Sequence, residues 1–537
     1  MGLGIREPRG GGHVPGTVKL YESDSVRSEA AVEENGELPF ARSFKKSGEG
    51  GITLVPQPSD SPNDPLNWPL WKKDLTLLTI CFATAVGCTL GPALAPVHAE
   101  LTVEYNTSYT MVANFTGYQF LATGMAGLLC EVMTRFLGRR PIYLLSTIFM
   151  FAGALWNSLI TSRDIDGFVG ARVLQGVGLG AFETLVITSI GDMYFVHERG
   201  KRIAFYNLLF FGVSYFTPVL AGYITAKYGW RMQFRIMAGI FIPALVMLFL
   251  FCPEHAFVRD RKFETDLVSE SSSTASVNVG EGKQEIRAAA VSVEPKKTFL
   301  QELKVYNGRF STDGFWKLLV APFPAMLYPA AIWVFLFQGT FVTWGIGVSV
   351  VLSQIFAAPP YNFNPTQMGY IYAAPTIGAL LAYILCMLTY DRLCIYLTKR
   401  NNFTYEPEFR ILLVIPVLLT GVPGLIAYGY ATTTPGLHWI IPSILYGMLT
   451  IAVVLSVEMM VAVLLLKNFF TWASTFYLSD WLVKWGARKV FLTMGLIQAV
   501  ICVGSVLIYV YGKVWRAMMV RVKLMERLGL KPGSMRH

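Results

Sequence analysis

Residues 168–193 read FVGARVLQGVGLGAFETLVITSIGDM, an apolar run long enough to cross a bilayer core, which takes about 20 residues of α-helix. One carboxylate, Glu183, lies near its middle. Eleven other apolar runs of similar length occur in the chain. The twelve runs lie near 75–98, 110–133, 142–160, 168–193, 203–226, 232–252, 326–352, 368–390, 411–431, 438–458, 461–483 and 490–511. The sequence therefore predicts an all-α polytopic membrane protein with twelve transmembrane helices.

The composition excludes an ordinary soluble enzyme. Of the 537 residues, 53% are hydrophobic and 15% charged, whereas soluble domains average roughly 45–50% and about 25%. The net charge of +10 comes from basic residues at the ends of apolar runs, which disfavours nucleic acid as a partner. The sequence has no HExxH motif, no phosphate-binding loop and no cysteines at metal-ligand spacing. We therefore expect no enzymatic activity, no dissociable cofactor and no metal site.

Polar segments divide the chain into predicted domains. Residues 1–70 are rich in Gly, Ser, Pro and Glu and are expected to form a disordered N-terminal tail. Residues 253–318 are charged and Ser-rich and are predicted to be a linker. The two six-helix halves then cover 71–252 and 319–511, and 512–537 form a basic tail. Two such halves around a linker are typical of transporters whose substrate site lies between the halves.

Basic residues in the short loops predict the orientation of the chain. Arg139, Arg199 and Arg400 follow spans 2, 4 and 8, and the tail after span 12 carries seven Lys and Arg against one Glu. The loops after spans 7 and 9 carry no charge. Because such basic residues favour the cytoplasmic side, we predict that both termini and the linker are cytoplasmic.

Spans 10 and 11 are separated by only a few residues around Glu458, and no Gly or Pro occurs from Met448 to Trp485. One long helix here would place the basic tail outside, so we predict two spans joined by a tight turn. Glu458 and Lys467 then lie toward the ends of these spans. An ion pair or gate is one interpretation, and boundary charges that reach the interface are the simpler one.

Several motifs together resemble those of one transporter family. They are Asn63-Asp64-Pro65-Leu66-Asn67-Trp68-Pro69, Gly138-Arg139-Arg140-Pro141, Arg172 with Gln175, Gly176, Gly178 and Gly180, the run Phe182 to Asp192 with 195–200, Gly229-Trp230-Arg231, Pro253-Glu254, and Glu406-Pro407-Glu408-Phe409-Arg410. On these motifs the chain resembles the major facilitator superfamily, and within it the fungal drug:proton antiporter branch with twelve spans. The run from Phe182 to Gly200 is similar to fungal permeases for polyamines and other organic cations.

The resemblance implies a set of residues that serve conformational change. The chain also departs from the family pattern at two places. The implied conformational residues are Gly138, Arg139, Arg140, Asp192, Pro218 and Gly222. Arg135 stands where the family usually has an acidic residue, and span 5 keeps only part of the antiporter glycine pattern, with Gly212 and Gly222. For Asp192 a structural network at the end of span 4 is the alternative to a role in transport.

Glu183 is the first candidate for substrate and proton binding, because an ionised carboxylate inside a bilayer costs at least a few kcal/mol. It would take up a proton in one orientation and pair a cationic substrate in another; the alternative is a buried structural carboxylate. Arg172 lies on the same helix face and shares this candidacy with Gln175. Their alternative roles are structural, with Arg172 reaching the interface or binding a carbonyl. Gly176 and Gly180 allow either close helix packing or room for a ligand.

In the second half, aromatic side chains with one amide suit an organic cation through cation–π contacts. The candidates are Trp333, Gln338 and Trp344 on span 7 and Tyr372 near span 8. The alternative for each ring is ordinary packing against lipid or other helices.

The sequence and the resemblance together predict a proton-coupled secondary transporter of small organic cations or amphiphiles that works by alternating access. Its partners would be a small-molecule substrate, protons and the lipid bilayer, and the resemblance implies a monomer in the plasma membrane. The alternatives are a facilitator for an anion or a sugar, and a membrane receptor of the same fold that has lost transport.

Overall fold

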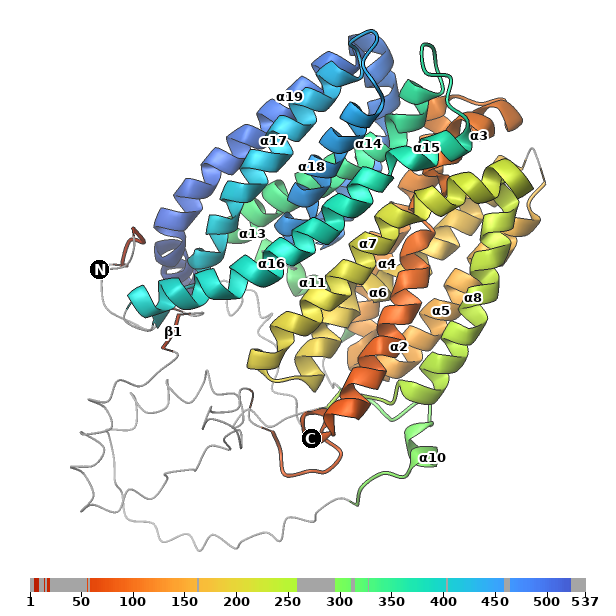
Figure 1. Cartoon of the computed structure of the whole chain (residues 1–537). Helices are drawn as coiled ribbons and strands as arrows, with labels where there is room; N and C mark the ends of the chain where they lie inside the picture. Colours follow the sequence, from red (N-terminus) through yellow and green to blue (C-terminus); the bar gives the residue numbers. More distant parts are fainter. Residues whose placement is uncertain are drawn as a thin grey trace, which may run out of the picture.

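The computed structural model describes residues 4–8, 14, 17–19, 56, 58–161, 164–257, 295–310, 314–326, 328–401, 404–457 and 464–522. These residues are almost entirely helical, as Figure 1 shows. The sheet among them is one antiparallel pair of two-residue strands, β1 (Val18–Lys19) and β2 (Thr404–Tyr405).

The long helices fall into two groups, joined by shorter elements. The first group consists of α2 (Leu70–Thr89), α4 (Tyr109–Leu137), α5 (Arg139–Leu159), α6 (Ile165–Met193), α7 (Val196–Tyr228) and α8 (Trp230–Phe251). The second consists of α14 (Thr340–Phe356), α16 (Ala373–Arg400), α17 (Val414–Ala431), α18 (Ile440–Val457) and α19 (Leu464–Val522). The shorter helical elements are η1 (Pro65–Asn67), η2 (Pro92–Val97), α3 (His98–Glu104), α10 (Phe299–Glu302), α11 (Phe315–Val320), α12 (Pro322–Met326), α13 (Pro329–Val334), the π-helical η4 (Phe335–Gly339), α15 (Pro365–Ile371) and η5 (Pro407–Leu413).

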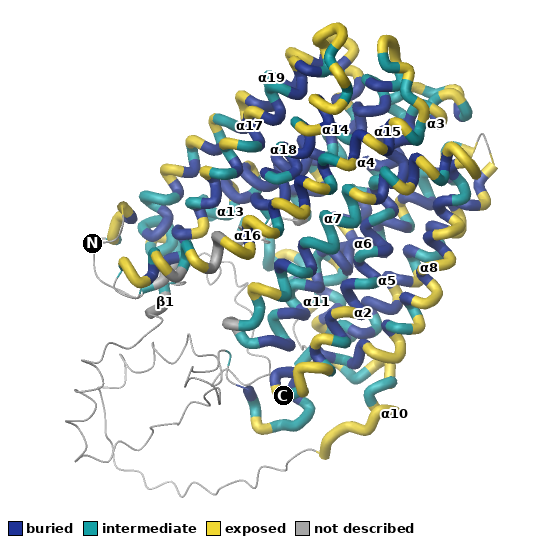
Figure 2. The backbone as a smooth tube through the Cα atoms, in the orientation of Figure 1, coloured by how far each residue is buried: buried dark blue, intermediate teal, exposed yellow. Residues whose placement is uncertain are grey.

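The buried apolar residues form two clusters that follow the two groups of helices. One cluster runs from Leu77 to Cys252, and the other lies mostly between Trp333 and Ile508. Figure 2 shows buried positions inside the bundle and exposed ones along its outer faces. Each half therefore has its own core, and the outward apolar side chains are those that would meet lipid.

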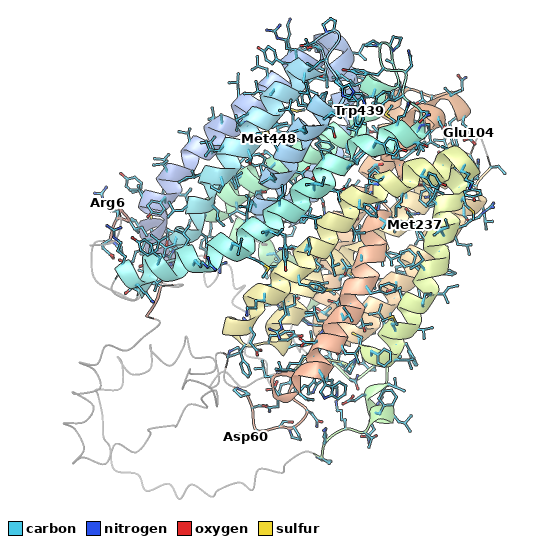
Figure 3. All side chains as sticks on the ribbon, in the orientation of Figure 1. Arg6, Asp60, Glu104, Met237, Trp439 and Met448 are labelled. Carbon is cyan, nitrogen blue, oxygen red and sulfur yellow. The ribbon has the colours of Figure 1, made fainter. Side chains whose placement is uncertain are left out.

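The two ends of the bundle are distinguished by their residues. One end carries Arg139 and Arg516, and we call it the basic end; the other carries Glu104 and Trp439, and we call it the opposite end. Figure 3 shows Glu104 and Trp439 at the latter, far from Asp60.

The last helix, α19, consists of two limbs that run in opposite directions. They meet at Gly486, whose φ of 74° and ψ of 156° are not helical. In the first limb, Asp480 accepts a 2.6 Å hydrogen bond from Thr110 at the start of α4, which is the opposite end. In the second limb, Arg516 at the basic end pairs with Glu408 at 2.7 Å.

Eleven helical segments among the described residues are long and apolar enough to cross a membrane, and α19 is one of them. Counted as two limbs, α19 brings the crossing segments in the described part of the chain to twelve. The predicted all-α fold of twelve transmembrane helices in two halves is confirmed. The predicted turn around Glu458 lies outside the described residues, and the domain boundaries stay predictions.

Part of the segment predicted to be a disordered tail is ordered by contacts with the helices. The Asp64 carboxylate is fully buried and accepts a 3.0 Å hydrogen bond from the backbone N–H of Leu66. The Leu66 carbonyl in turn accepts from Lys73 Nζ of α2 at 3.0 Å. Composition alone does not reveal that this short segment has specific partners on α2, and the extent of the disordered tail stays a prediction. Most of residues 1–57 lie outside the described part of the chain.

Candidate functional site

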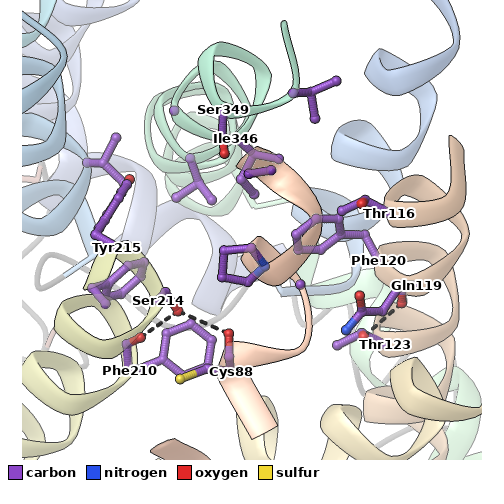
Figure 4. A pocket seen from close by; sticks show the side chains of 18 of the residues that line it. Cys88, Thr116, Gln119, Phe120, Thr123, Phe210, Ser214, Tyr215, Ile346 and Ser349 are labelled. Atoms are coloured by element: carbon purple, nitrogen blue, oxygen red, sulfur yellow. Dashed lines mark hydrogen bonds between the residues drawn. The ribbon is translucent and has the colours of Figure 1, made fainter. Parts of the chain in front are cut away.

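A cavity of about 120 Å³ lies between the two halves. Its lining residues are Cys88, Gly91, Pro92, Ala95, His98, Thr116, Gln119, Phe120, Thr123, Leu179, Glu183, Phe210, Phe211, Ser214 and Tyr215 from the first half, and Val342, Gly345, Ile346, Ser349, Val350, Tyr372, Tyr446, Val453 and Lys467 from the second. Figure 4 shows Gln119 and Thr123 of α4 on one side and Phe210 and Tyr215 of α7 on the other. The wall is mostly apolar and aromatic, with a few polar groups.

Glu183 on α6 is bound by two side chains of the other half. Its Oε1 accepts a hydrogen bond from Lys467 Nζ in a salt bridge, and its Oε2 accepts from Asn468 Nδ2 at 2.7 Å. Glu183 and Lys467 are each 8% exposed. In low-dielectric surroundings an ionised carboxylate needs such a partner, so this pair is both an electrostatic requirement and a link between the halves.

Lys467 was not predicted as a site residue. Its position six residues into span 11 suggested a boundary charge, but the structure places it in the cavity wall, and that interpretation was wrong. The signal available in the sequence was the pair Lys467-Asn468 inside an otherwise apolar run. Its partner is 284 residues away, and no sequence pattern connects the two.

The glycines of α6 allow close packing against α4. A Cβ at Gly176 would lie 2.3 Å from the Gln119 carbonyl oxygen, and one at Gly180 would lie 2.7 Å from the Gly127 nitrogen. Of the two roles considered for these glycines, the structure therefore supports close packing. This contact brings Glu183 to the face of α6 that borders the cavity.

Arg172 and Gln175 are buried beside the cavity and are held by protein groups. Arg172, which is 0% exposed, donates to the Leu90 carbonyl at 2.6 Å and to Gln175 Oε1 at 2.9 Å. Gln175 donates to the Gly153 carbonyl at 3.0 Å. Leu90 follows the last residue of α2, where carbonyls lack helical partners, and Arg172 supplies a donor there. This arrangement matches the carbonyl-binding alternative for Arg172.

The aromatic candidates of the second half are divided between the cavity and the core. Tyr372 lines the cavity, and its hydroxyl lies 2.8 Å from Ser349 Oγ. The indole N–H groups of Trp333 and Trp344 donate to Ser505 and Gln498, both at 3.1 Å, inside the second half. Gln338 is buried in η4, 7% exposed, and is not part of the cavity wall. The other rings of the wall, which sequence reasoning missed, are Phe120, Phe210, Phe211, Tyr215 and Tyr446.

The loop between α4 and α5 is fixed at the basic end by a carboxylate that follows α8. Glu254 accepts hydrogen bonds from the backbone N–H groups of Arg139 and Arg140 at 3.0 and 3.2 Å, and so caps the start of α5. The Arg139 guanidinium pairs with Asp192 at 2.7 Å. Gly138 has φ 89°, and a Cβ there would lie 2.2 Å from Glu254 Oε2, so only glycine fits.

A buried histidine next to this loop leads to a pH-dependent stability prediction. His255 Nε2 lies 2.9 Å from Ser189 Oγ, and burial lowers the pKa of His255 to about 3. Since the unfolded chain binds this proton near pH 6.5, the stabilisation is present above that pH and is lost as the pH falls toward the folded pKa. We expect a decrease of about 1 kcal/mol in the free energy of unfolding from pH 7.5 to 5.5, which His255→Gln should remove.

Thermal unfolding of the purified protein at the two pH values measures this effect. His438→Gln, at an exposed position, is the matched control and should keep the wild-type pH dependence. Equal pH dependence in wild type and His255→Gln would contradict the assignment.

Pro218 and Gly222, predicted to serve conformational change, lie where α7 meets the second half. A Cβ at Gly222 would lie 2.3 Å from the Pro365 carbonyl oxygen, and one at Gly369 would lie 3.0 Å from the Pro218 carbonyl oxygen. The backbones of α7 and α15 are therefore in direct contact near the opposite end. His98 Nδ1 and the Val350 carbonyl, 3.1 Å apart, form a second contact between the halves there.

Comparison with known proteins agrees with this architecture. A family model described as Major Facilitator Superfamily matches residues 75–468. An uncharacterized MFS-type transporter of Schizosaccharomyces pombe is 25% identical over 93% of this chain and 92% of its own length. Protein HOL1 of Saccharomyces cerevisiae is 23% identical over 93% and 95%. Among solved structures, a mutant of peptide transporter POT in complex with alafosfalin covers 82% of this chain and 95% of its own, with 13% identity and a TM-score of 0.54, a likeness of fold.

Proposed function

The chain belongs to the major facilitator superfamily, and on that premise we propose that it is a proton-coupled secondary transporter of small organic cations or amphiphilic compounds. The observation that carries the proposal is the Glu183 carboxylate in the cavity between the halves, bound by Lys467 and Asn468 of the other half. In the proposed orientation the basic end faces the cytoplasm. We also propose that the protein is a monomer in the plasma membrane.

The Glu183 carboxylate can bind either a proton or a cationic substrate, and this competition provides a mechanism for exchange. In the arrangement described, Lys467 neutralises Glu183 across the two halves. Protonation of Glu183 would remove its electrostatic attraction to Lys467 and so weaken this link between the halves. A cationic substrate would instead displace Lys467 from the same carboxylate oxygens. Because Glu183 cannot hold a proton and a substrate cation at once, release of one favours binding of the other. This competition supports proton antiport.

The rest of the cavity wall suits an organic rather than an inorganic cation. Six aromatic rings line it, among them Phe120, Phe210 and Tyr446. Ring faces attract desolvated organic ammonium groups, and the apolar wall favours the attached hydrocarbon.

A second candidate is cotransport of an organic anion with a proton, and Lys467 is the observation that favours it. When Glu183 is protonated, Lys467 becomes an unpaired cation in the wall of the cavity. An anionic substrate could then bind to it. Cation exchange is preferred because it makes direct use of the aromatic wall.

Uptake by proteoliposomes tests the proposal. We expect labelled spermidine or a cationic drug to accumulate when a pH gradient is imposed, whereas labelled glucose and an organic monocarboxylate do not. Gradient-driven uptake of the monocarboxylate alone would support the second candidate. Absence of flux for all four compounds would contradict both and favour a receptor without transport.

A further inference from the structure

Two buried polar atoms, each in a residue that lines the cavity, have no hydrogen-bond partner among the described residues. They are Nε2 of His98, a side chain 3% exposed, and Oε1 of Gln119, a side chain 2% exposed. His98 begins α3 and Gln119 belongs to α4, and both line the cavity. Buried polar groups are paired in the large majority of cases, so two unpaired ones at one cavity indicate a missing partner.

The hydrogen-bonding pattern determines what kind of partner is missing. His98 Nδ1 lies 3.1 Å from the Val350 carbonyl oxygen, which can only accept, so Nδ1 carries the hydrogen. A buried imidazole without a carboxylate partner in the described part of the chain is expected to be neutral, and its Nε2 is then an acceptor. Oε1 of Gln119 is also an acceptor. Both atoms therefore lack a donor.

These acceptors lie at a different level of the bundle from Glu183. Helices α4 and α6 both begin at the opposite end; Gln119 is 10 residues beyond Tyr109, and Glu183 is 18 residues beyond Ile165. At about 1.5 Å per residue, the difference of eight residues corresponds to roughly 12 Å along the bundle. The cavity thus has one polar site near the opposite end and one deeper site at the Glu183–Lys467 pair.

We propose that His98 Nε2 and Gln119 Oε1 form a subsite for an N–H donor group of the substrate, so that the substrate is an elongated molecule with two amine groups. This inference rests on the proposed function, since it assigns the first amine to Glu183. The second amine donates to His98 and Gln119, and the hydrocarbon between the two lies along the aromatic wall. Because His98 also contacts Val350 of the other half, the subsite lies at the closed contact between the halves.

Two substitutions at one position separate the subsite from the contact between the halves. In His98→Asn, the side-chain amide can still donate to Val350 in place of Nδ1, but nothing replaces Nε2. In His98→Gln, the longer amide can present its oxygen near the position of Nε2. Gln119→Leu removes the second acceptor and puts an apolar side chain of similar size in its place.

Binding of octane-1,8-diamine and of octan-1-amine to the purified full-length protein, measured by calorimetry, tests the proposal. The wild type should bind the diamine about tenfold more tightly, the gain expected from added charge-assisted hydrogen bonds. His98→Asn and Gln119→Leu should lower this preference to nearly one, mainly through weaker binding of the diamine, and His98→Gln should keep most of it.

The subsite is wrong if the wild type binds neither amine, binds both equally, or keeps its preference in His98→Asn. A preference that disappears in His98→Asn supports it. Failure of the subsite is distinguishable from failure of the proposed function: gradient-driven amine uptake without diamine preference overturns the subsite alone, whereas a His98-dependent preference without any uptake overturns the transport proposal alone.

Discussion

Glu183→Gln is expected to abolish uptake driven by a pH gradient. Glutamine keeps the size of the side chain and can still accept from Asn468, but it does not take up or release a proton. Exchange of labelled for unlabelled substrate at equal pH needs no proton step, so at substrate concentrations high enough to offset weaker binding of the cation by glutamine, exchange should persist where gradient-driven uptake is lost. Both rates are measured in the same proteoliposomes.

The partner of Glu183 provides the control for folding. Removal of one member of a buried ion pair leaves the other unpaired, at a typical cost of about 3–5 kcal/mol, so Glu183→Gln alone is expected to be less stable. The double substitution Glu183→Gln with Lys467→Met removes both charges and should regain stability without regaining gradient-driven uptake. Wild-type gradient-driven uptake in either variant would refute the assignment of Glu183.

The sequence predicted those parts of the fold and the site that depend on local pattern. The apolar runs predicted the crossing helices. A carboxylate in the middle of an apolar run marked Glu183 as a candidate site residue, and Glu183 does line the cavity. The partners of that carboxylate depend on how two distant helices pack. Lys467 and His98 were missed for this reason, since each lies near the end of an apolar run, where a charged or polar residue has an ordinary explanation.

Aromatic residues show the same limit. Trp333 and Trp344 are large rings inside a predicted span, as are the rings that line the cavity, yet their indole N–H groups donate to Ser505 and Gln498 of α19. Which face of a buried helix borders a cavity depends on the rotation of the helix against its neighbours. In a segment that is apolar on all sides, the sequence contains no signal for that rotation.

A methyl group added at Gly222 is expected to reduce transport about tenfold or more, since overpacking of this kind costs roughly 1–3 kcal/mol. The new Cβ would lie 2.3 Å from the Pro365 carbonyl oxygen. The backbone of α7 fixes the position of that Cβ and the oxygen belongs to the backbone of α15, so neither atom can rotate away. The halves would then have to separate at the opposite end. Gly222→Ala should therefore favour a conformation that is open at that end and closed at the basic end.

The same helix contains the matched control. A Cβ at Gly212 would meet only Leu208 Cδ1, at 3.7 Å, an ordinary contact. Gly212→Ala should be neutral or slightly stabilising, because alanine favours helix by roughly 1 kcal/mol over glycine. Spin labels at Val103 and Thr433, exposed positions of the two halves at the opposite end, report the separation. We expect the distance between the two labels to be longer in Gly222→Ala and unchanged in Gly212→Ala. An unchanged distance together with normal transport in Gly222→Ala would show that the α7–α15 contact is not part of the transport cycle.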